Sequence, residues 1–225
     1  CYSYELAVII YDGLQRMFVN KEPIFYYVTL MNENYPHPSI PDGVDIGIKK
    51  GMYLLCSKGK SKSKMVRLLG SGAILREVEK AADLLLEREI SSQVWSVTSY
   101  IELARELRDI DRQNLLNVEE DHLVSYVGEC LEGDRPVIAA SDYVKAVPEQ
   151  LRSAIQAPYH VLGTDGFGRS DTLEKLRQFF EVNHQFIAYT ALVKLYEIGV
   201  CEKKVLSDFK KEFDIDSDKP NPRLA

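Results

Sequence analysis

The segment GTDGFGRSD, residues 163–171, follows a short apolar stretch at residues 159–162 and precedes a run with helical periodicity. Its three glycines permit positive φ angles and close backbone approach, so a tight turn can connect the apolar stretch to the helical run. Asp171 is a natural N-cap, and Glu174 three residues later completes a capping box. The pattern predicts a strand, a turn and a helix in succession, and leaves open whether the turn is structural or binds a ligand.

The same alternation of apolar stretches and helical periodicity covers most of the chain. Strands are predicted at residues 65–69, 94–98, 136–140 and 159–162. Helices are predicted at residues 73–88, 101–116, from 141 to about 155, 172–182, 185–198 and 202–213. Strands separated by helices indicate an α/β fold of three layers, αβα, with a mainly parallel sheet and helices on both faces.

The N-terminal part has a different pattern. Apolar residues recur at helical spacing over residues 4–18, and the β-branched and aromatic run IFYYVTLM at 24–31 predicts a buried strand. Three prolines within NENYPHPSIP, residues 32–41, exclude regular structure there.

We therefore expect two domains, with a helix and a strand in residues 1–41 and the α/β unit in residues 42–225. Asp42 is expected to cap a helix that runs to about residue 55, and the Pro- and charge-rich tail from Asp214 is expected to be loosely ordered.

Composition excludes several classes of protein. The chain has 225 residues, 28% of them charged, and a net charge of −6, which argues against a general nucleic-acid binder. No run approaches the roughly 18 apolar residues that span a bilayer, so no membrane partner is expected. Four scattered cysteines without metal-ligand spacing indicate a reducing, cytoplasmic setting and no metal site. Since the chain starts within a helical pattern and without Met, we expect it to begin inside a larger protein.

The turn Gly70-Ser71-Gly72 follows a strand and opens a helix, as a dinucleotide-binding turn does. That motif requires Gly or Ala three residues after the second glycine, and Leu75 stands there instead. A structural turn is therefore favoured. The exposed amides at the helix start are still able to bind an anion weakly, so an independent nucleotide- or anion-binding module remains the alternative hypothesis.

Small polar residues end several of the predicted strands. Open α/β sheets bind ligands outside the carboxyl ends of their strands, but such residues also cap the helices that follow. Ligand binding and helix capping therefore both stay open as roles for the residues at the carboxyl edge of the predicted sheet. The residues concerned are Ser71, Ser99, Ser141, Asp142, Thr164 and Asp165.

Three further features are candidates for function. His37 lies between two prolines and is a candidate acid or base, although a solvated loop histidine is the simpler interpretation. Arg169, beside glycines, can bind a phosphate or form an interdomain ion pair. The polar segment at residues 57–64, with lysines at 58, 60, 62 and 64, is a solvated loop or a docking patch for an acidic partner.

Several segments together resemble the homodimeric bacterial pyruvate dehydrogenase family, the decarboxylating first component of its complex. The resemblance runs from residue 1 to the last residue in order. It rests on CYSYELAVIIYDGLQRMF (1–18), YYVTLMNENYPHP (26–38), GIKKGMYLL (47–55), LLGSGAILREV (68–78), VWSVTSYIEL (94–103), ASDYVKA (140–146), VLGTDGFGRSD (161–171) and NPRLA (221–225).

This resemblance implies a transketolase-like C-terminal domain that follows the end of a pyrimidine-binding domain. It also implies a parent enzyme that uses thiamine diphosphate and Mg²⁺, forms a homodimer and passes an acetyl group to the lipoyl group of a dihydrolipoyl acetyltransferase core. The family's Gly-Asp-Gly metal motif is missing here, and its catalytic histidines and cofactor-activating glutamate precede residue 1.

We therefore assign no catalytic, cofactor or metal residue to this chain and expect it to be inactive and without cofactor when alone. Asp165, Arg169 and Asp171 are expected to be interface residues.

Overall fold

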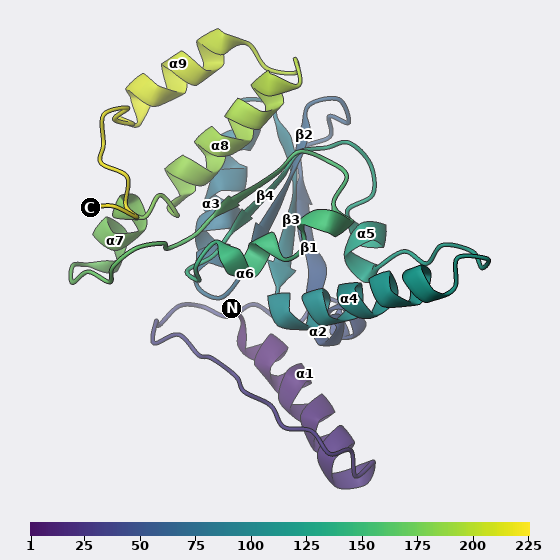
Figure 1. Cartoon of the computed structure of the whole chain (residues 1–225). Coiled ribbons are helices and arrows are strands. Elements are labelled where there is room, and N and C mark those ends of the chain that lie inside the picture. Colours follow the sequence, from purple (N-terminus) through teal and green to yellow (C-terminus); the bar gives the residue numbers. More distant parts are fainter.

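The computed structural model describes all 225 residues as a five-stranded sheet between two layers of helices, with an N-terminal helix at one end (Figure 1). The strands are β1 (Met52–Lys58), β2 (Met65–Gly70), β3 (Ser91–Val97), β4 (Val137–Ala140) and β5 (Tyr159–Leu162). Their order is β1-β3-β2-β4-β5, and only β1 is antiparallel to its neighbour. The predicted three-layer fold with a mainly parallel sheet is confirmed.

Helices cover both faces of the sheet. The bounds are α1 (Ser3–Leu14), α2 (Asp45–Lys50), α3 (Ile74–Leu86), α4 (Tyr100–Leu116), α5 (Tyr126–Cys130), α6 (Ala146–Glu149), α7 (Leu173–Phe179), α8 (His184–Glu197) and α9 (Lys203–Glu212). A π-helical turn, Gln15–Val19, extends α1, and a 3₁₀ turn, Arg152–Ala154, follows α6.

Alternate residues of each strand enter two separate cores, as the strand period of two requires. On one face, Leu68 of β2 and Ile138 of β4 pack among side chains of α3 and α8. On the other face, Leu69 of β2 and Ala139 of β4 join a core that includes α4 and α5. The central strands are therefore buried on both faces, which explains why they appear in the sequence as continuous apolar runs.

Two N-terminal predictions are wrong. Residues 24–31 form no strand, and Phe25 and Tyr27 are 88% and 87% exposed, because no sheet edge in this chain lies beside them to pair with their backbone. The helix predicted from Asp42 to residue 55 ends instead at Gly51, and the following residues form β1. Asp42 does not cap α2, whose N-cap position is Val44.

Two C-terminal predictions also need correction. Thr172, not Asp171, caps α7, since its Oγ1 accepts a hydrogen bond from the Lys175 amide at 3.4 Å. The tail after Asp214 is not loosely placed, because Lys219 donates to the carbonyl oxygen of Phe179 and to the Glu181 carboxylate.

We expect the Gly70→Ala substitution to destabilise the fold. A Cβ on Gly70 would lie 2.7 Å from the Leu75 Cα and 2.9 Å from a Val78 methyl, so β2 and α3 would have to separate. Overpacking of this kind costs about 1–3 kcal/mol in the free energy of unfolding, which urea denaturation measures.

Gly168→Ala is the matched control, because a Cβ there meets no atom within 4 Å. We expect it to change the free energy of unfolding by less than about 1 kcal/mol. Equal stability of the two variants would contradict a tight contact between β2 and α3.

Candidate functional site

The carboxyl edge of the parallel strands gathers the polar residues that follow β2, β4 and β5. The hydroxyl oxygens of Ser71 and Ser141 are 2.8 Å apart, and the Thr164 hydroxyl donates to the carbonyl oxygen of Asp142 at 2.5 Å. Asp165 Oδ1 accepts a hydrogen bond from the Lys145 amide at 2.9 Å. The predicted edge is confirmed for the residues that follow β2, β4 and β5, while Ser99 after β3 caps α4 by accepting a hydrogen bond from the Glu102 amide at 3.2 Å.

The crevice most suited to a ligand on this edge lies between β2 and β4. The chain runs from β2 to β3 on one side and from β4 to β5 on the other, so the direction of winding reverses between β2 and β4. Ligands of open α/β sheets bind at such reversal points. Gly72 and Asp142 both lie there, since a Cβ on Gly72 would be 3.9 Å from the Asp142 carboxylate.

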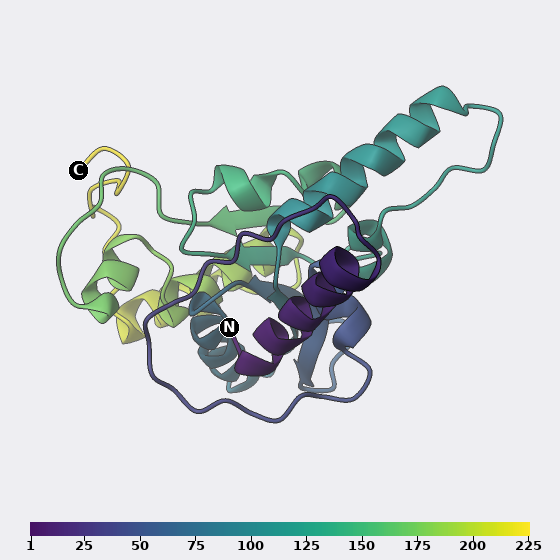
Figure 2. The same cartoon turned by 90° about the horizontal axis from the view of Figure 1, so that it is seen from below.

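The N-terminal segment contacts the chain at this point. A Cβ on Gly72 would lie 3.8 Å from Met31, and the hydroxyl oxygens of Thr29 and Tyr143 are 2.7 Å apart. In the view from below, the residues that follow α1 cross in front of the sheet (Figure 2). Burial raises the pKa of the Asp142 carboxyl at this contact. The turn at Gly70-Ser71-Gly72 therefore contacts protein where a nucleotide would have to bind.

A partly buried ion-pair network stabilises the end of that segment. Glu33 accepts a hydrogen bond from Arg177 of α7 and lies 3.7 Å from Arg76 of α3. Arg177 also lies 3.8 Å from the carboxylate of Glu77. The network joins α3, α7 and the N-terminal segment, three parts of the chain that are distant in sequence.

Glu77 is the most buried charge in this network, with 6% of its side chain exposed. It accepts a hydrogen bond from the His184 amide at 3.1 Å and another from Lys80 at 2.8 Å, and the Nδ1 atom of His184 lies 2.6 Å away. Burial alone would raise the pKa of the Glu77 carboxyl, but these donors outweigh it and lower the pKa to about 2.

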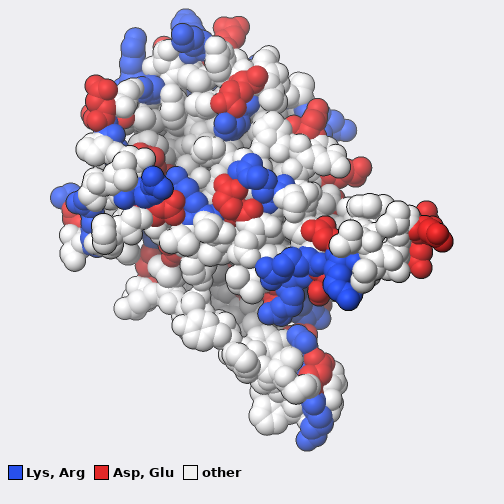
Figure 3. All heavy atoms as spheres, viewed as in Figure 1, with Lys and Arg blue, Asp and Glu red and all other residues white.

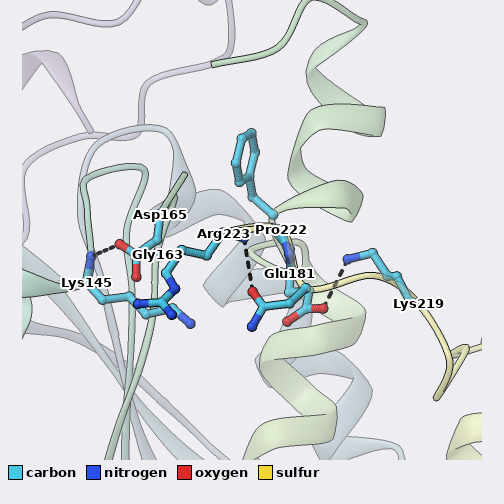
Figure 4. Close-up of a pocket in the computed structure, with 9 residues that line it drawn as sticks. Lys145, Gly163, Asp165, Glu181, Lys219, Pro222 and Arg223 are labelled. Carbon is cyan, nitrogen blue, oxygen red and sulfur yellow. Dashed lines mark hydrogen bonds and ion pairs between the residues drawn. The ribbon is translucent and has the colours of Figure 1, made fainter. Parts of the chain in front are cut away.

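A second hollow on the same edge lies beyond β5, between the loop after β5 and the C-terminal tail (Figure 4). Its volume is about 490 Å³, and its lining is almost entirely polar. The lining residues are Lys145, Gly163, Asp165, Phe180, Glu181, Lys219, Asn221, Pro222 and Arg223. We call this hollow the tail cleft. It brings the GTDGFGRSD segment and the terminal NPRLA segment together.

The remaining predicted residues lie apart from one another. His37 accepts a hydrogen bond from the Ser3 amide at 3.0 Å, and its ring centroid is 4.9 Å from that of Tyr35, so it stabilises the start of α1. The guanidinium of Arg169 covers the Phe179 ring at 4.2 Å. Asp171 is exposed and accepts a hydrogen bond from the Thr172 amide at 2.8 Å. None of these contacts assembles a catalytic group.

The lysine-rich segment is only partly a free loop. Lys58 lies at the end of β1, and its Nζ is 2.6 Å from the Asp83 carboxylate. Residues 59–64 connect β1 to β2, and Lys60 and Lys62 are exposed. Since β1 is an edge strand, lysines here also oppose edge-to-edge association.

Sequence reasoning missed four residues that shape this edge, namely Glu33, Glu77, Lys145 and Arg223. Glu77 lies on the apolar face of a helix, where a carboxylate signals a buried partner. The other three carry no such signal, because their positions depend on where the N-terminal segment and the tail return to the sheet.

Sequence comparisons match two families in succession. The transketolase-like TK C-terminal domain model matches residues 51–183, and the model of the pyruvate dehydrogenase E1 component middle domain matches residues 1–38. The chain is 48% identical over 227 residues to the pyruvate dehydrogenase E1 component of Escherichia coli (strain K12) and 49% identical over 224 residues to that of Pseudomonas aeruginosa.

These alignments cover 100% and 98% of this chain but 25% of each relative, so the chain spans about a quarter of the length of the relatives it matches. Among solved structures, transketolase from Leishmania mexicana is similar over 69% of this chain and 19% of its own, with 19% identity and a TM-score of 0.47. None of the helices combines the length and the apolar character of a transmembrane span.

The network around Glu77 predicts a pH dependence of stability. Because the pKa of Glu77 is about 2 in the folded chain and near 4.5 without its partners, its contribution is complete above pH 4.5 and is lost as the pH falls toward 2. We expect Glu77→Gln to lower the free energy of unfolding by about 3 kcal/mol at pH 7 and by much less near pH 2.5.

Urea denaturation at both pH values measures this difference, with Glu174→Gln as the control, since Glu174 is exposed and forms no ion pair. A loss that is the same at both pH values would show that the ionised carboxylate does not stabilise the fold.

Proposed function

Because the chain belongs to the family of transketolase-like C-terminal domains, we propose that it is the C-terminal part of a pyruvate dehydrogenase E1 component. In this role it supports the catalytic domains and carries none of the reacting groups. The observation that carries the proposal is the succession of two family matches, middle domain then C-terminal domain, within a chain 48% identical to a bacterial E1 component from end to end.

In this proposal the parent subunit decarboxylates pyruvate with thiamine diphosphate and Mg²⁺ and transfers the acetyl group to a lipoyl group. The proposed partners are a second copy of the subunit and the dihydrolipoyl acetyltransferase core, in the cytoplasm. Thiamine diphosphate supplies the carbanion chemistry when it is bound, and the protein's task is to position it.

The residues of this chain do not fit that cofactor. Mg²⁺ requires several oxygen ligands around one point, and no group of three or more His, Cys, Asp or Glu side chains here can hold a metal ion. Between the ends of β2 and β4, Met31 lies against the turn at Gly72. We therefore assign cofactor binding to other parts of the parent protein.

An apolar surface on the N-terminal segment supports the proposal. Large hydrophobic side chains are exposed along residues 10–31, and much of the lower part of the molecule in Figure 3 is free of charged side chains. They are Ile10, Tyr11, Leu14, Phe18, Val19, Phe25, Tyr26, Tyr27, Val28, Leu30 and Met31. A patch of this extent is typical of an interface. We assign residues 1–41 to the end of the middle domain, whose other parts would cover this surface.

The alternative of an independent nucleotide-binding module is less well supported. Its proposed site at Gly70-Ser71-Gly72 contacts Met31, and the Ser71 hydroxyl is already paired with Ser141. A nucleotide would have to displace these contacts before it reached the helix start.

We expect the isolated chain to release no CO₂ from pyruvate in the presence of thiamine diphosphate and Mg²⁺, and to give no calorimetric signal with the cofactor. The physical reason is the missing set of oxygen ligands. Turnover by the pure chain would contradict a supporting role.

A chimera tests the positive side of the proposal. The Escherichia coli E1 component, with its C-terminal quarter replaced by this chain from residue 1, is expected to form a dimer and to retain pyruvate-dependent acetylation of lipoyl groups. The matched control carries Phe25→Asp and Tyr27→Asp, which place two charges on the apolar surface and should abolish assembly. A folded wild-type chimera without activity would contradict the assignment.

A further inference from the structure

The tail cleft is independent of the proposed function, and its lining comes from the loops after β4, β5 and α7 and from the C-terminal tail. The loop after β5 forms one wall and the C-terminal tail forms the other (Figure 4). At about 490 Å³ the cleft falls within the range of small-molecule sites.

Two contacts fix the tail wall in place. Lys219 donates to the Phe179 carbonyl oxygen and lies 3.0 Å from the Glu181 carboxylate. Further along, Gly166 has a φ of +106°, and a Cβ there would lie 2.6 Å from the Pro222 carbonyl oxygen. Only a glycine lets the two backbones approach this closely, so the position of Arg223 follows from that of the loop.

Lys145 and Arg223 are the cations without partners in this cleft. The backbone amide of Lys145 donates to Asp165 at 2.9 Å, and that of Arg223 donates to Asn221 at 3.0 Å. Neither side chain takes part in a hydrogen bond or a salt bridge, and both extend into the cleft in Figure 4. Two positive charges are therefore available to a ligand.

The acidic residues of the cleft already have donors. Glu181 is paired with Lys219, and Asp165 Oδ1 accepts the Lys145 amide. The charges of Lys219 and Glu181 cancel, so the five charged side chains of the lining carry a net charge of +1, on a chain whose total is −6. A local excess of positive charge on an acidic protein favours anions over cations or neutral ligands.

We propose that the tail cleft binds a phosphorylated small molecule, with Lys145 and Arg223 on its phosphate group. An ammonium and a guanidinium together match the double charge of a phosphate, and the fork of Arg223 suits two phosphate oxygens. The cleft is larger than inorganic phosphate requires, which leaves room for the body of a metabolite of nucleotide size. Asn221 and the carboxylates offer polar groups to that body.

Isothermal titration calorimetry of the 225-residue chain tests this assignment with three probes: inorganic phosphate, adenosine 5′-diphosphate and citrate. We expect the diphosphate to bind with a Kd below about 1 mM. Lys145→Gln and Arg223→Gln should each weaken binding about tenfold or more, because each removes a charge-assisted contact. Amide NMR signals of Gly163 and Asn221 should shift on titration.

Lys211→Gln is the matched control, since Lys211 is exposed on α9 outside the cleft and forms no salt bridge. Its Kd should equal that of the unchanged chain. No binding of the diphosphate up to about 10 mM would overturn the proposal, and so would binding that neither cleft variant weakens. Citrate binding as tight as diphosphate binding would overturn the assignment to phosphate.

Discussion

The carboxylate of Glu5 is the interaction on which the arrangement of the chain depends. Glu5 is 2% exposed and accepts hydrogen bonds from the Tyr2 amide, the Tyr53 hydroxyl of β1 and the Ser96 hydroxyl of β3. A buried carboxylate is tolerated only where such donors surround it. The start of α1 can therefore lie at one place on the sheet, and that place determines where the segment after it can run.

Glu33 stabilises the other end of the segment against α3 and α7. Between these two carboxylates the chain passes the carboxyl edge, where Met31 contacts the turn at Gly72.

Much of the α/β unit could be predicted from sequence, because its signals are local. β2, β3, β4 and β5 have apolar runs bounded by turn residues, and α3 has an apolar stripe at helical spacing. β1 was missed because its pairing with β3 is distant in sequence and because Gly51, rather than a proline, ends the preceding helix. The strand predicted at residues 24–31 failed for the opposite reason. Its β-branched and aromatic residues favour an extended strand, but no neighbouring strand is present to pair with it. The β-propensity of a segment indicates the backbone conformation that it favours. A sheet also requires the free edge of another strand to pair with.

The candidate site was predictable to the extent that topology alone determines it. Ser71, Asp142 and Asp165 follow parallel strands, so they had to meet at one edge, and they do. What occupies that edge was not predictable. Met31 and Glu33 reach it through a long irregular connection, and Arg223 reaches it through a tail that has no periodic pattern. In both cases the last contact depends on tertiary packing. The hydrophobic pattern of the sequence carries no information about it.

The contacts between the N-terminal segment and the α/β unit differ in kind from those within the unit. Inside the unit, two apolar cores hold the layers together. Across the boundary, polar bonds from Glu5 and Glu33 add to the packing of Tyr2, and Thr29 and Tyr143 pair through their hydroxyls. Interfaces between domains of one chain are typically more polar than domain cores, because each side must also be stable in water. Directional bonds of this kind set an orientation, while the large hydrophobic side chains along residues 10–30 stay exposed. The N-terminal segment is thus oriented by polar bonds to the α/β unit, while its apolar side chains are left uncovered by the rest of the chain. Such a segment is suited to position the α/β unit against a larger protein that covers those side chains.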